Sequence, residues 1–173
     1  MIMTHKKKYA IFVTQEDKIM SNMMDISKKR KELSEYEKHL NEQLAIFNAL
    51  SRDYLNIFLL DAESGMGKIL KLDGYVTTGL KKDSNIEYPY EATCRQYISE
   101  RVHPDDRQMM RDAMRIERVL QELSDKTEYV STYKTLVDGE KHYYQFKYMR
   151  LENTKHIVAG FQNIDALIAK ERE

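Results

Sequence analysis

The sequence predicts an α+β fold: a five-stranded antiparallel sheet with helices packed on one face, preceded by a long N-terminal helix. Three observations predict this fold. Residues 127–164 alternate apolar and polar side chains with a period of two, which is typical of strands with one buried face. Residues 89–123 instead space their apolar side chains by three or four, as helices do. Residues 19–54 contain no glycine or proline and repeat apolar side chains every seven residues.

The heptad repeat predicts that the N-terminal helix forms a coiled coil and that the protein is a homodimer. Ile26, Leu33, Leu40 and Phe47 fall on one register, with charged residues between them. The second position of the apolar seam is often polar, so the coiled coil should be weak by itself. The alternative is a single amphipathic helix that packs on its own domain.

Turn and helix signals divide the rest of the chain. Asp138-Gly139 is a strong hairpin signal, because both positions of a tight hairpin turn need residues that tolerate positive φ. The change from a period of two to a period of three or four separates strands from helices. The expected elements are strands at 54–61 and 68–72 joined by a turn at 63–67, a glycine-containing region at 73–85, helices at 89–100 and 104–123, and strands at 127–137, 141–151 and 156–164.

Composition excludes several classes of function. Lys+Arg and Asp+Glu both total 28, so the chain lacks the basic excess of a nucleic-acid-binding protein. Its apolar runs are too short to span a membrane, and its N-terminus has no cleavable signal pattern. The single cysteine, Cys94, cannot form an internal disulfide and fits a reducing compartment. We therefore expect a cytoplasmic protein without a membrane span.

The stretch RVHPDDR places a histidine beside two carboxylates and could be read as a metal or acid–base site. A helix start explains the same residues. Pro104 suits the first helical position, and Asp105 and Asp106 then lie in the first turn, where the helix dipole favours negative charge. His103 would occupy the cap. No other histidine or cysteine has the spacing of a metal ligand. The sequence therefore predicts no catalytic residue and no metal site here.

These motifs give the chain a resemblance to a known family. The stretch His103-Pro104-Asp105-Asp106-Arg107, the hairpin turn at 138–139 and the closing sequence GFQNID at 160–165 resemble PAS sensor domains of bacterial signalling proteins. The resemblance covers residues 51–165 and implies a PAS fold of the HPDD type. The sequence ILKLDGY at 69–75 is similar to PAS domains that precede GGDEF diguanylate cyclase domains.

Two short motifs resemble the exit where the last PAS strand passes into a signalling helix. Asp25 and Ile26 form the first, and Asn163, Ile164 and Asp165 form the second. The resemblance implies that these residues transmit the signal. It divides the chain into residues 1–25, a remnant of a preceding module or an N-terminal strand (residues 9–15); residues 26–50, a signalling helix; residues 51–165, the PAS domain; and residues 166–173, the start of a helical linker to an absent output domain.

The cofactor stays open, because no flavin or haem motif is present. Cys94 lies where flavin-binding PAS domains keep the cysteine that forms the flavin adduct, but the neighbouring residues Thr93 and Gln96 differ from that family's motif. A buried structural cysteine is the favoured interpretation.

Twelve tyrosines and ten methionines are available to line a small-molecule cavity of the kind that PAS domains often form between helices and sheet. A filled core is an equally good interpretation of the same residues. The candidates for the cavity wall are Phe58, Leu60, Tyr97, Met110, Met114, Tyr133 and Phe146.

The resemblance implies a non-catalytic sensory and dimerisation module that regulates a C-terminal GGDEF diguanylate cyclase. A ligand-free structural adaptor and the sensor domain of a histidine kinase are the alternatives. An enzyme is the least favoured class, because no nucleophile–base pair or metal cluster stands out.

Overall fold

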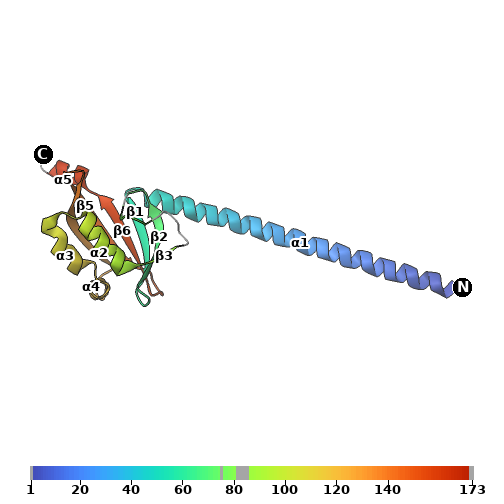
Figure 1. Cartoon of the computed structure of the whole chain (residues 1–173). Helices are drawn as coiled ribbons and strands as arrows, with labels where there is room; N and C mark the ends of the chain where they lie inside the picture. Colours follow the sequence, from blue (N-terminus) through green and yellow to red (C-terminus); the bar gives the residue numbers. More distant parts are fainter. Residues whose placement is uncertain (1, 75, 81–85, 172–173) are drawn as a thin grey trace. The chain divides into compact units, whose positions relative to one another are not determined.

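The structure is a computed structural model that describes residues 2–74, 76–80 and 86–171 (Figure 1). The chain divides into two compact units, residues 1–51 and residues 52–173. Of the expected glycine-containing region at 73–85, residues 75 and 81–85 lie outside the described residues. The elements are α1 (Ile2–Leu50), β1 (Asn56–Asp61), β2 (Met66–Leu72), β3 (Glu87–Pro89), α2 (Tyr90–Arg101), a short 3-10 helix η1 (Pro104–Asp106), α3 (Arg107–Ala113), α4 (Ile116–Glu122), β4 (Glu128–Val137), β5 (Glu140–Arg150), β6 (His156–Asn163) and α5 (Asp165–Glu171).

The first unit is the helix α1, which is longer than the heptad repeat predicted. It runs from Ile2 to Leu50 without a break. Residues 9–15 are therefore helical, and the alternative of an N-terminal strand there is wrong. Asp25 and Ile26 lie in the middle of this helix, with helical residues on both sides.

The second unit is built on one antiparallel sheet with the strand order β3-β2-β1-β6-β5-β4. The predicted α+β fold is confirmed, with a sixth strand added to the predicted five. That strand, β3, has three residues and pairs with the edge of β2. It ends at Pro89, where we had predicted the start of a helix. Three residues are too short for an alternating pattern to be recognised.

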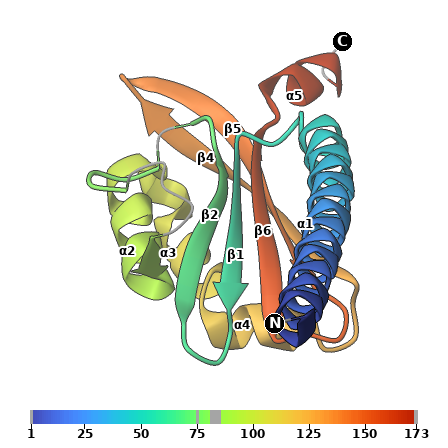
Figure 2. The ribbon, with the colours of Figure 1, turned by 90° about the vertical axis from the view of Figure 1, so that its right-hand side faces the viewer.

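Helices α2, α3 and α4 pack on one face of the sheet (Figure 2). The single helix predicted for 104–123 is three helices, η1, α3 and α4. The break lies at Arg115, whose backbone is extended. No glycine or proline marks this break, so the sequence offered no signal for it.

The predicted hairpin turn is present. Asp138 and Gly139 both have positive φ, 51° and 83°, as a tight two-residue hairpin turn requires. The turn joins β4 and β5, which pair in register along their whole length from Val137↔Glu140 to Glu128↔Met149.

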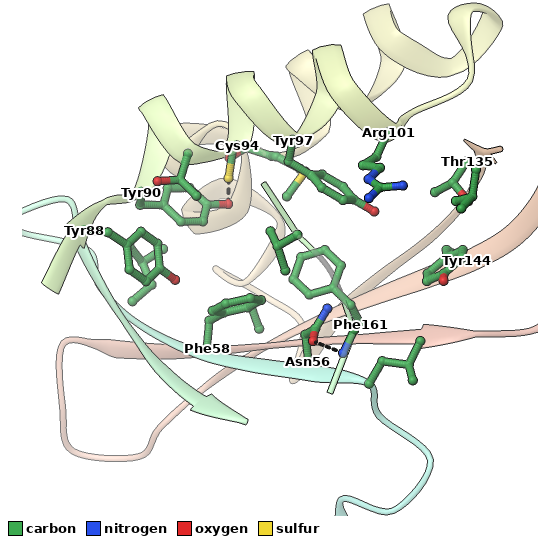
Figure 3. A pocket seen from close by; sticks show the side chains of 18 residues that line it. Asn56, Phe58, Tyr88, Tyr90, Cys94, Tyr97, Arg101, Thr135, Tyr144 and Phe161 are labelled. Atoms are coloured by element: carbon green, nitrogen blue, oxygen red, sulfur yellow. Dashed lines mark hydrogen bonds between the residues drawn. The ribbon is translucent and has the colours of Figure 1, made fainter. Parts of the chain in front are cut away.

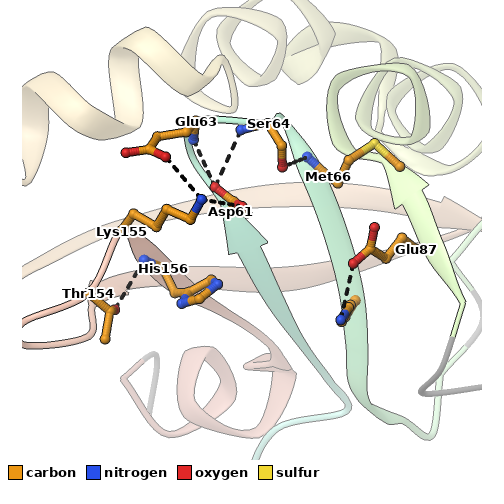
Figure 4. A network of polar contacts seen from close by, with 9 residues as sticks. Asp61, Glu63, Ser64, Met66, Glu87, Thr154, Lys155 and His156 are labelled. Carbon is orange, nitrogen blue, oxygen red and sulfur yellow. Dashed lines mark hydrogen bonds and ion pairs between the residues drawn. The ribbon is translucent and has the colours of Figure 1, made fainter.

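A polar cluster fixes the turn between β1 and β2 (Figure 4). The Asp61 carboxylate accepts hydrogen bonds from the N–H groups of Glu63 at 3.0 Å and Ser64 at 3.3 Å. Lys155, which precedes β6, pairs with Asp61 at 3.2 Å and with Glu63 at 2.9 Å. Burial acts to raise the pKa of Asp61, but these hydrogen bonds outweigh it and lower the pKa to about 2. The cluster therefore ties two neighbouring turns at one end of the sheet.

Candidate functional site

A cavity of about 210 Å³ lies between α2 and the sheet (Figure 3). Its volume equals that of roughly seven water molecules at ~30 Å³ each, which is enough for a compact organic ligand. Its wall comes from β1, β3, α2, β4, β5, β6, the segments beside β1 and β2, and Met114, which follows α3. Residues that line the cavity therefore come from positions far apart in the sequence, from Leu55 to Phe161.

One part of the cavity wall is apolar and aromatic. The Phe58 ring meets the ring of Tyr88 edge to face at a centroid distance of 6.0 Å and the ring of Phe161 at 5.7 Å. Leu60 and Ala159, both buried, extend this surface along β1 and β6. The Tyr88 ring lies over Gly67, where a Cβ would approach it to 2.6 Å. Any side chain at position 67 would therefore displace the Tyr88 ring from this part of the wall.

Another part of the wall is polar. Arg101, the last residue of α2, lies on the same side of the cavity as Thr135 of β4 and Tyr144 of β5 (Figure 3). Thr135 is 2% exposed, and its Oγ1 has no hydrogen-bond partner among the described residues. A buried hydroxyl without a hydrogen-bond partner lowers the stability of the folded state, because its lost hydration is not replaced.

Two pairs of buried tyrosine hydroxyls brace the helices against the sheet. Tyr90 donates its hydroxyl proton to the Met114 carbonyl at 2.8 Å, so Tyr148 must be the donor in the 2.7 Å contact between the Tyr148 and Tyr90 hydroxyls. The hydroxyls of Tyr97 and Tyr133 lie 2.7 Å apart. Burial raises the pKa of all four phenols, so they stay neutral at physiological pH.

The structure brings together some of the residues chosen from the sequence. Phe58, Leu60, Tyr97 and Met114 line the cavity. Met110, Tyr133 and Phe146 do not line it, and all three are buried in the core. The heptad residues Ile26, Leu33 and Leu40 are between 47% and 59% exposed, and Phe47 is half-buried.

Sequence reasoning missed most of the polar wall. Asn56, Arg101, Thr135 and Tyr144 were not among the candidates, and neither was Phe161. One signal was available for Tyr144, which alternates with Phe146 and Tyr148 on one face of β5. No pattern in the sequence indicates that a residue at the end of α2 meets β4.

The Cys94 thiol is buried, as expected for a structural cysteine. It lies against the hydroxyl of Tyr90 on the inner side of α2 (Figure 3). Burial raises its pKa to about 12, so it is a neutral thiol rather than a nucleophilic thiolate.

The stretch at 103–107 starts a helix, as predicted. His103 is the N-cap of η1 and accepts a hydrogen bond from the Asp105 N–H at 3.3 Å, and Pro104 is the first helical residue. Among the described residues, no group of three or more potential ligands could hold a metal ion.

The same stretch also attaches the end of α2 to β4, which the sequence did not predict. The His103 N–H donates to the Lys134 carbonyl at 2.8 Å, and the Lys134 N–H donates to the Asp106 carboxylate at 2.7 Å. Val102 forms a β-bridge with Thr135. The Arg107 guanidinium donates to the carbonyls of Val102 and Ser99, both at 3.0 Å. These bonds fix Arg101 beside Thr135 at the polar wall of the cavity.

The two aspartates of this stretch are expected to differ in their effect on stability. Asp106→Ala removes the acceptor of the Lys134 N–H and should lower the free energy of unfolding by about 1.5–3 kcal/mol. Asp105 has a side chain that is 69% exposed, so Asp105→Ala should change it by less than about 0.5 kcal/mol. Urea denaturation followed by near-ultraviolet circular dichroism compares the two variants. Equal losses would contradict the structural role given to Asp106.

The end of the last strand is tied to the beginning of β5. The Ile164 N–H donates to the Tyr143 carbonyl at 2.9 Å, and the Tyr143 N–H donates to the Asp165 carboxylate at 2.6 Å. The Asn163 side chain accepts from the Asp165 N–H at 2.8 Å. Burial acts to raise the pKa of Asp165, but the hydrogen bonds from Tyr143, His142 and Asn163 leave it below its usual value. These hydrogen bonds hold the first residue of α5, Asp165, against β5.

No protein-family model and no curated protein matches this chain. Several solved structures are similar to it, and they include the following two. The PAS domain of BvgS from Bordetella pertussis is 20% identical over 78% of this chain and 92% of its own length, with a TM-score of 0.41. An RNA-binding light-oxygen-voltage receptor is 16% identical over 68% of this chain, with a TM-score of 0.42. The match spans 30% of that receptor's length.

The second unit has the α+β fold that the sequence predicted, an antiparallel sheet with helices on one face. The sheet order and the placement of α2, α3 and α4 on one face carry this statement. None of the described helices is both long and apolar enough to cross a membrane.

Proposed function

We propose that this chain is a non-catalytic sensory and dimerisation module of a bacterial signal-transduction protein, in which the cavity holds a small ligand. The cavity carries the proposal, because its aromatic wall and its polar wall meet around about 210 Å³. Ligand sites in proteins typically combine such an apolar surface with a few polar groups that set orientation.

The route from cavity to output runs through β5 and β6. Phe161 and Tyr144 line the cavity, and Tyr144 pairs in register with Asn163, two residues after Phe161. A ligand that contacts these rings acts within two residues of the bonds that fix α5. The ligand shifts the output only if it binds two packings of this region with different affinities.

The dimer is proposed to form through α1. Its heptad residues Ile26, Leu33 and Leu40 are apolar and largely exposed in the single chain, at seven-residue spacing. Exposed apolar side chains at this spacing are what a second helix of the same kind would cover. A homodimer would place two copies of α5, and whatever follows them, under common control.

The output is proposed to be a C-terminal GGDEF diguanylate cyclase in a cytoplasmic protein, as the resemblance at 69–75 implies. A histidine-kinase sensor shares the same module and differs in the domain that follows. A ligand-free dimerisation adaptor is the alternative from another class. This chain contains no Gly-Gly-Asp/Glu-Glu-Phe sequence, so it should not synthesise cyclic di-GMP, and detecting that activity would contradict the proposal.

Native mass spectrometry of the purified protein, with a denatured control, tests the proposal directly. We expect a dimer that carries one discrete extra mass per chain, which is lost on denaturation. A dimer at the bare chain mass favours the ligand-free adaptor. A bare monomer across the micromolar range would contradict the dimer.

A further inference from the structure

We propose that the cavity takes a compact, uncharged aromatic molecule that ends in a carbonyl oxygen, which accepts hydrogen bonds from the hydroxyls of Thr135 and Tyr97. This inference rests on the proposed sensory function and names the chemistry of its ligand. It is carried by two hydroxyl groups at one end of the cavity whose hydrogen-bonding capacity the described residues leave unused.

The first hydroxyl is that of Thr135. Thr135 lines the cavity and is 2% exposed, and its Oγ1 has no hydrogen-bond partner among the described residues. Rotation about its Cα–Cβ bond moves the hydroxyl between staggered positions and can turn it toward a bound molecule. A ligand oxygen that accepts this proton would replace the hydration that the hydroxyl loses on burial.

The second hydroxyl belongs to Tyr97. The hydroxyls of Tyr97 and Tyr133 lie 2.7 Å apart, and this is the one hydrogen bond that the described part of the chain gives to either hydroxyl. Each hydroxyl carries one proton, so the contact uses one proton of the pair and leaves the other without an acceptor. Tyr97 lines the cavity and Tyr133 does not. When Tyr133 is the donor, the Tyr97 proton is therefore available to a ligand.

Strand register brings these groups together before any ligand binds. Tyr133 and Thr135 are two residues apart on β4, so both side chains lie on the same face of the sheet. Tyr133 pairs with Tyr144 on β5, which lines the cavity on the same side as Thr135 (Figure 3). The bridge between Val102 and Thr135 attaches the end of α2, the helix that carries Tyr97, to β4. Little ordering is therefore needed on binding.

The rest of the wall suits an aromatic body. The rings of Phe58 and Phe161 meet edge to face at a centroid distance of 5.7 Å, and the Tyr97 ring lies 6.4 Å from the Phe161 ring. Tyr97 thus connects the hydroxyl end of the cavity to its aromatic surface. About 210 Å³ accommodates roughly seven to ten non-hydrogen atoms at ~20–30 Å³ each. A single phenyl ring with a short carbonyl substituent has this size, and its edges and faces can pack against these rings.

The wall favours an uncharged ligand. No aspartate or glutamate is among the described residues that line the cavity, so a cation would meet no opposite charge there. Tyr90, Tyr97 and Cys94 are neutral, because burial raises the pKa of their side chains. Arg101 also lines the cavity, but it already interacts within the protein, so we assign the polar contact of the ligand to the hydroxyls. Burying an ion without a partner costs much more than burying a carbonyl group that is hydrogen-bonded.

Probes of nearly one shape test the proposal on the full chain. Acetophenone carries the carbonyl oxygen, and α-methylstyrene replaces that oxygen with a methylene group. Benzoate adds a negative charge, and benzamidine, which is protonated at neutral pH, adds a positive one. Isothermal titration calorimetry measures the dissociation constant of each. We expect acetophenone to bind at least tenfold more tightly than each of the others, because they lack the acceptor or bring an unpaired charge. Acetophenone should also raise the melting temperature.

Two variants assign the preference to the hydroxyls. Thr135→Val should weaken acetophenone about tenfold and leave α-methylstyrene unchanged, with the unliganded protein as stable as before or more so, since this hydroxyl has no partner to lose. Tyr97→Phe keeps the ring and should also weaken acetophenone about tenfold. Thr132→Val is the matched control, because Thr132 lies on the same strand as Thr135 but is exposed and does not line the cavity.

The outcomes separate this inference from the proposed function. If α-methylstyrene binds as tightly as acetophenone, the role of the hydroxyls is wrong and an apolar ligand is favoured. Tighter binding of benzoate or benzamidine would contradict the uncharged ligand, and a preference that persists unchanged in folded Thr135→Val and Tyr97→Phe protein would contradict the assignment to these hydroxyls. If no probe binds, the inference is wrong. The sensory function then stands if the purified protein carries an extra mass, and it falls if the protein carries none. Should Tyr97→Phe fail to fold, Thr135→Val decides.

Discussion

Phe146→Ala should lower the free energy of unfolding of the sheet unit by about 3–5 kcal/mol, the largest effect that we expect from a single substitution. Phe146 is fully buried on β5. Its ring contacts Tyr148 at a centroid distance of 5.2 Å, Tyr129 at 5.3 Å and Tyr133 at 6.3 Å. Deleting it leaves a hole among rings that are held by their neighbours and cannot collapse freely.

Val130→Ala is the control for this substitution. Val130 lies on the neighbouring strand β4 and is 37% exposed, so its truncation should cost less than about 1 kcal/mol. Urea denaturation followed by near-ultraviolet circular dichroism reports on the packed tyrosines of the second unit, since the chain has no tryptophan. A loss below about 1 kcal/mol for Phe146→Ala would contradict the packing described here.

The contrast between Phe146 and Tyr144 shows why the sequence predicted the sheet better than the cavity. Both residues lie on the same face of β5, and an alternating pattern treats them alike. Tyr144 lines the cavity and Phe146 does not. The difference depends on which side chains from β4, β6 and α2 lie above each position, and no local pattern carries that information. Phe161 was missed for the same reason, although it pairs with Phe146 in register.

Boundaries were predicted well where a residue type fixes the backbone. Asp138-Gly139 required positive φ and marked its turn, and Pro104 marked the start of η1. The break at Arg115 and the strand β3 have no such marker, because they form through tertiary contacts. The N–H of Ile116 after the break lies 3.5 Å from the Glu91 carboxylate on α2, a partner 25 residues away.

The stretch HPDD begins a helix and also attaches that helix to β4. Its proline and aspartates explain the helix start without any chemistry, and this prediction is confirmed. The additional finding is the bond between the Lys134 N–H and Asp106, which joins the helix start to β4. A sequence shows that Asp106 is acidic, but not that its carboxylate accepts a hydrogen bond from a backbone N–H 28 residues later. Arg101 and Thr135 become neighbours through this attachment.

The double substitution Leu33→Lys and Leu40→Lys should convert the proposed dimer to a monomer. In a symmetric pair of α1 helices four leucines leave the interface, each contributing about 1.5–3 kcal/mol when fully buried, and four positive charges enter it. The dissociation constant should therefore rise by more than about a thousandfold. The seam already contains the polar residues Asn22 and Gln43, so it has little stability in reserve.

The control places the same two lysines one residue further along. Ser34→Lys and Asn41→Lys lie seven residues apart on the exposed surface of α1, about 100° around the helix from the leucines. Sedimentation equilibrium over a hundredfold range of concentration should show a dimer for this control and a monomer for the leucine variant, while the near-ultraviolet spectrum of the second unit stays unchanged in both. A leucine variant that remains fully dimeric would place the dimer interface outside the heptad seam, and the proposal that the dimer forms through α1 would then have to be abandoned. Loss of the dimer in both variants would instead indicate that charge on any face of α1 prevents pairing, which a two-helix seam does not predict.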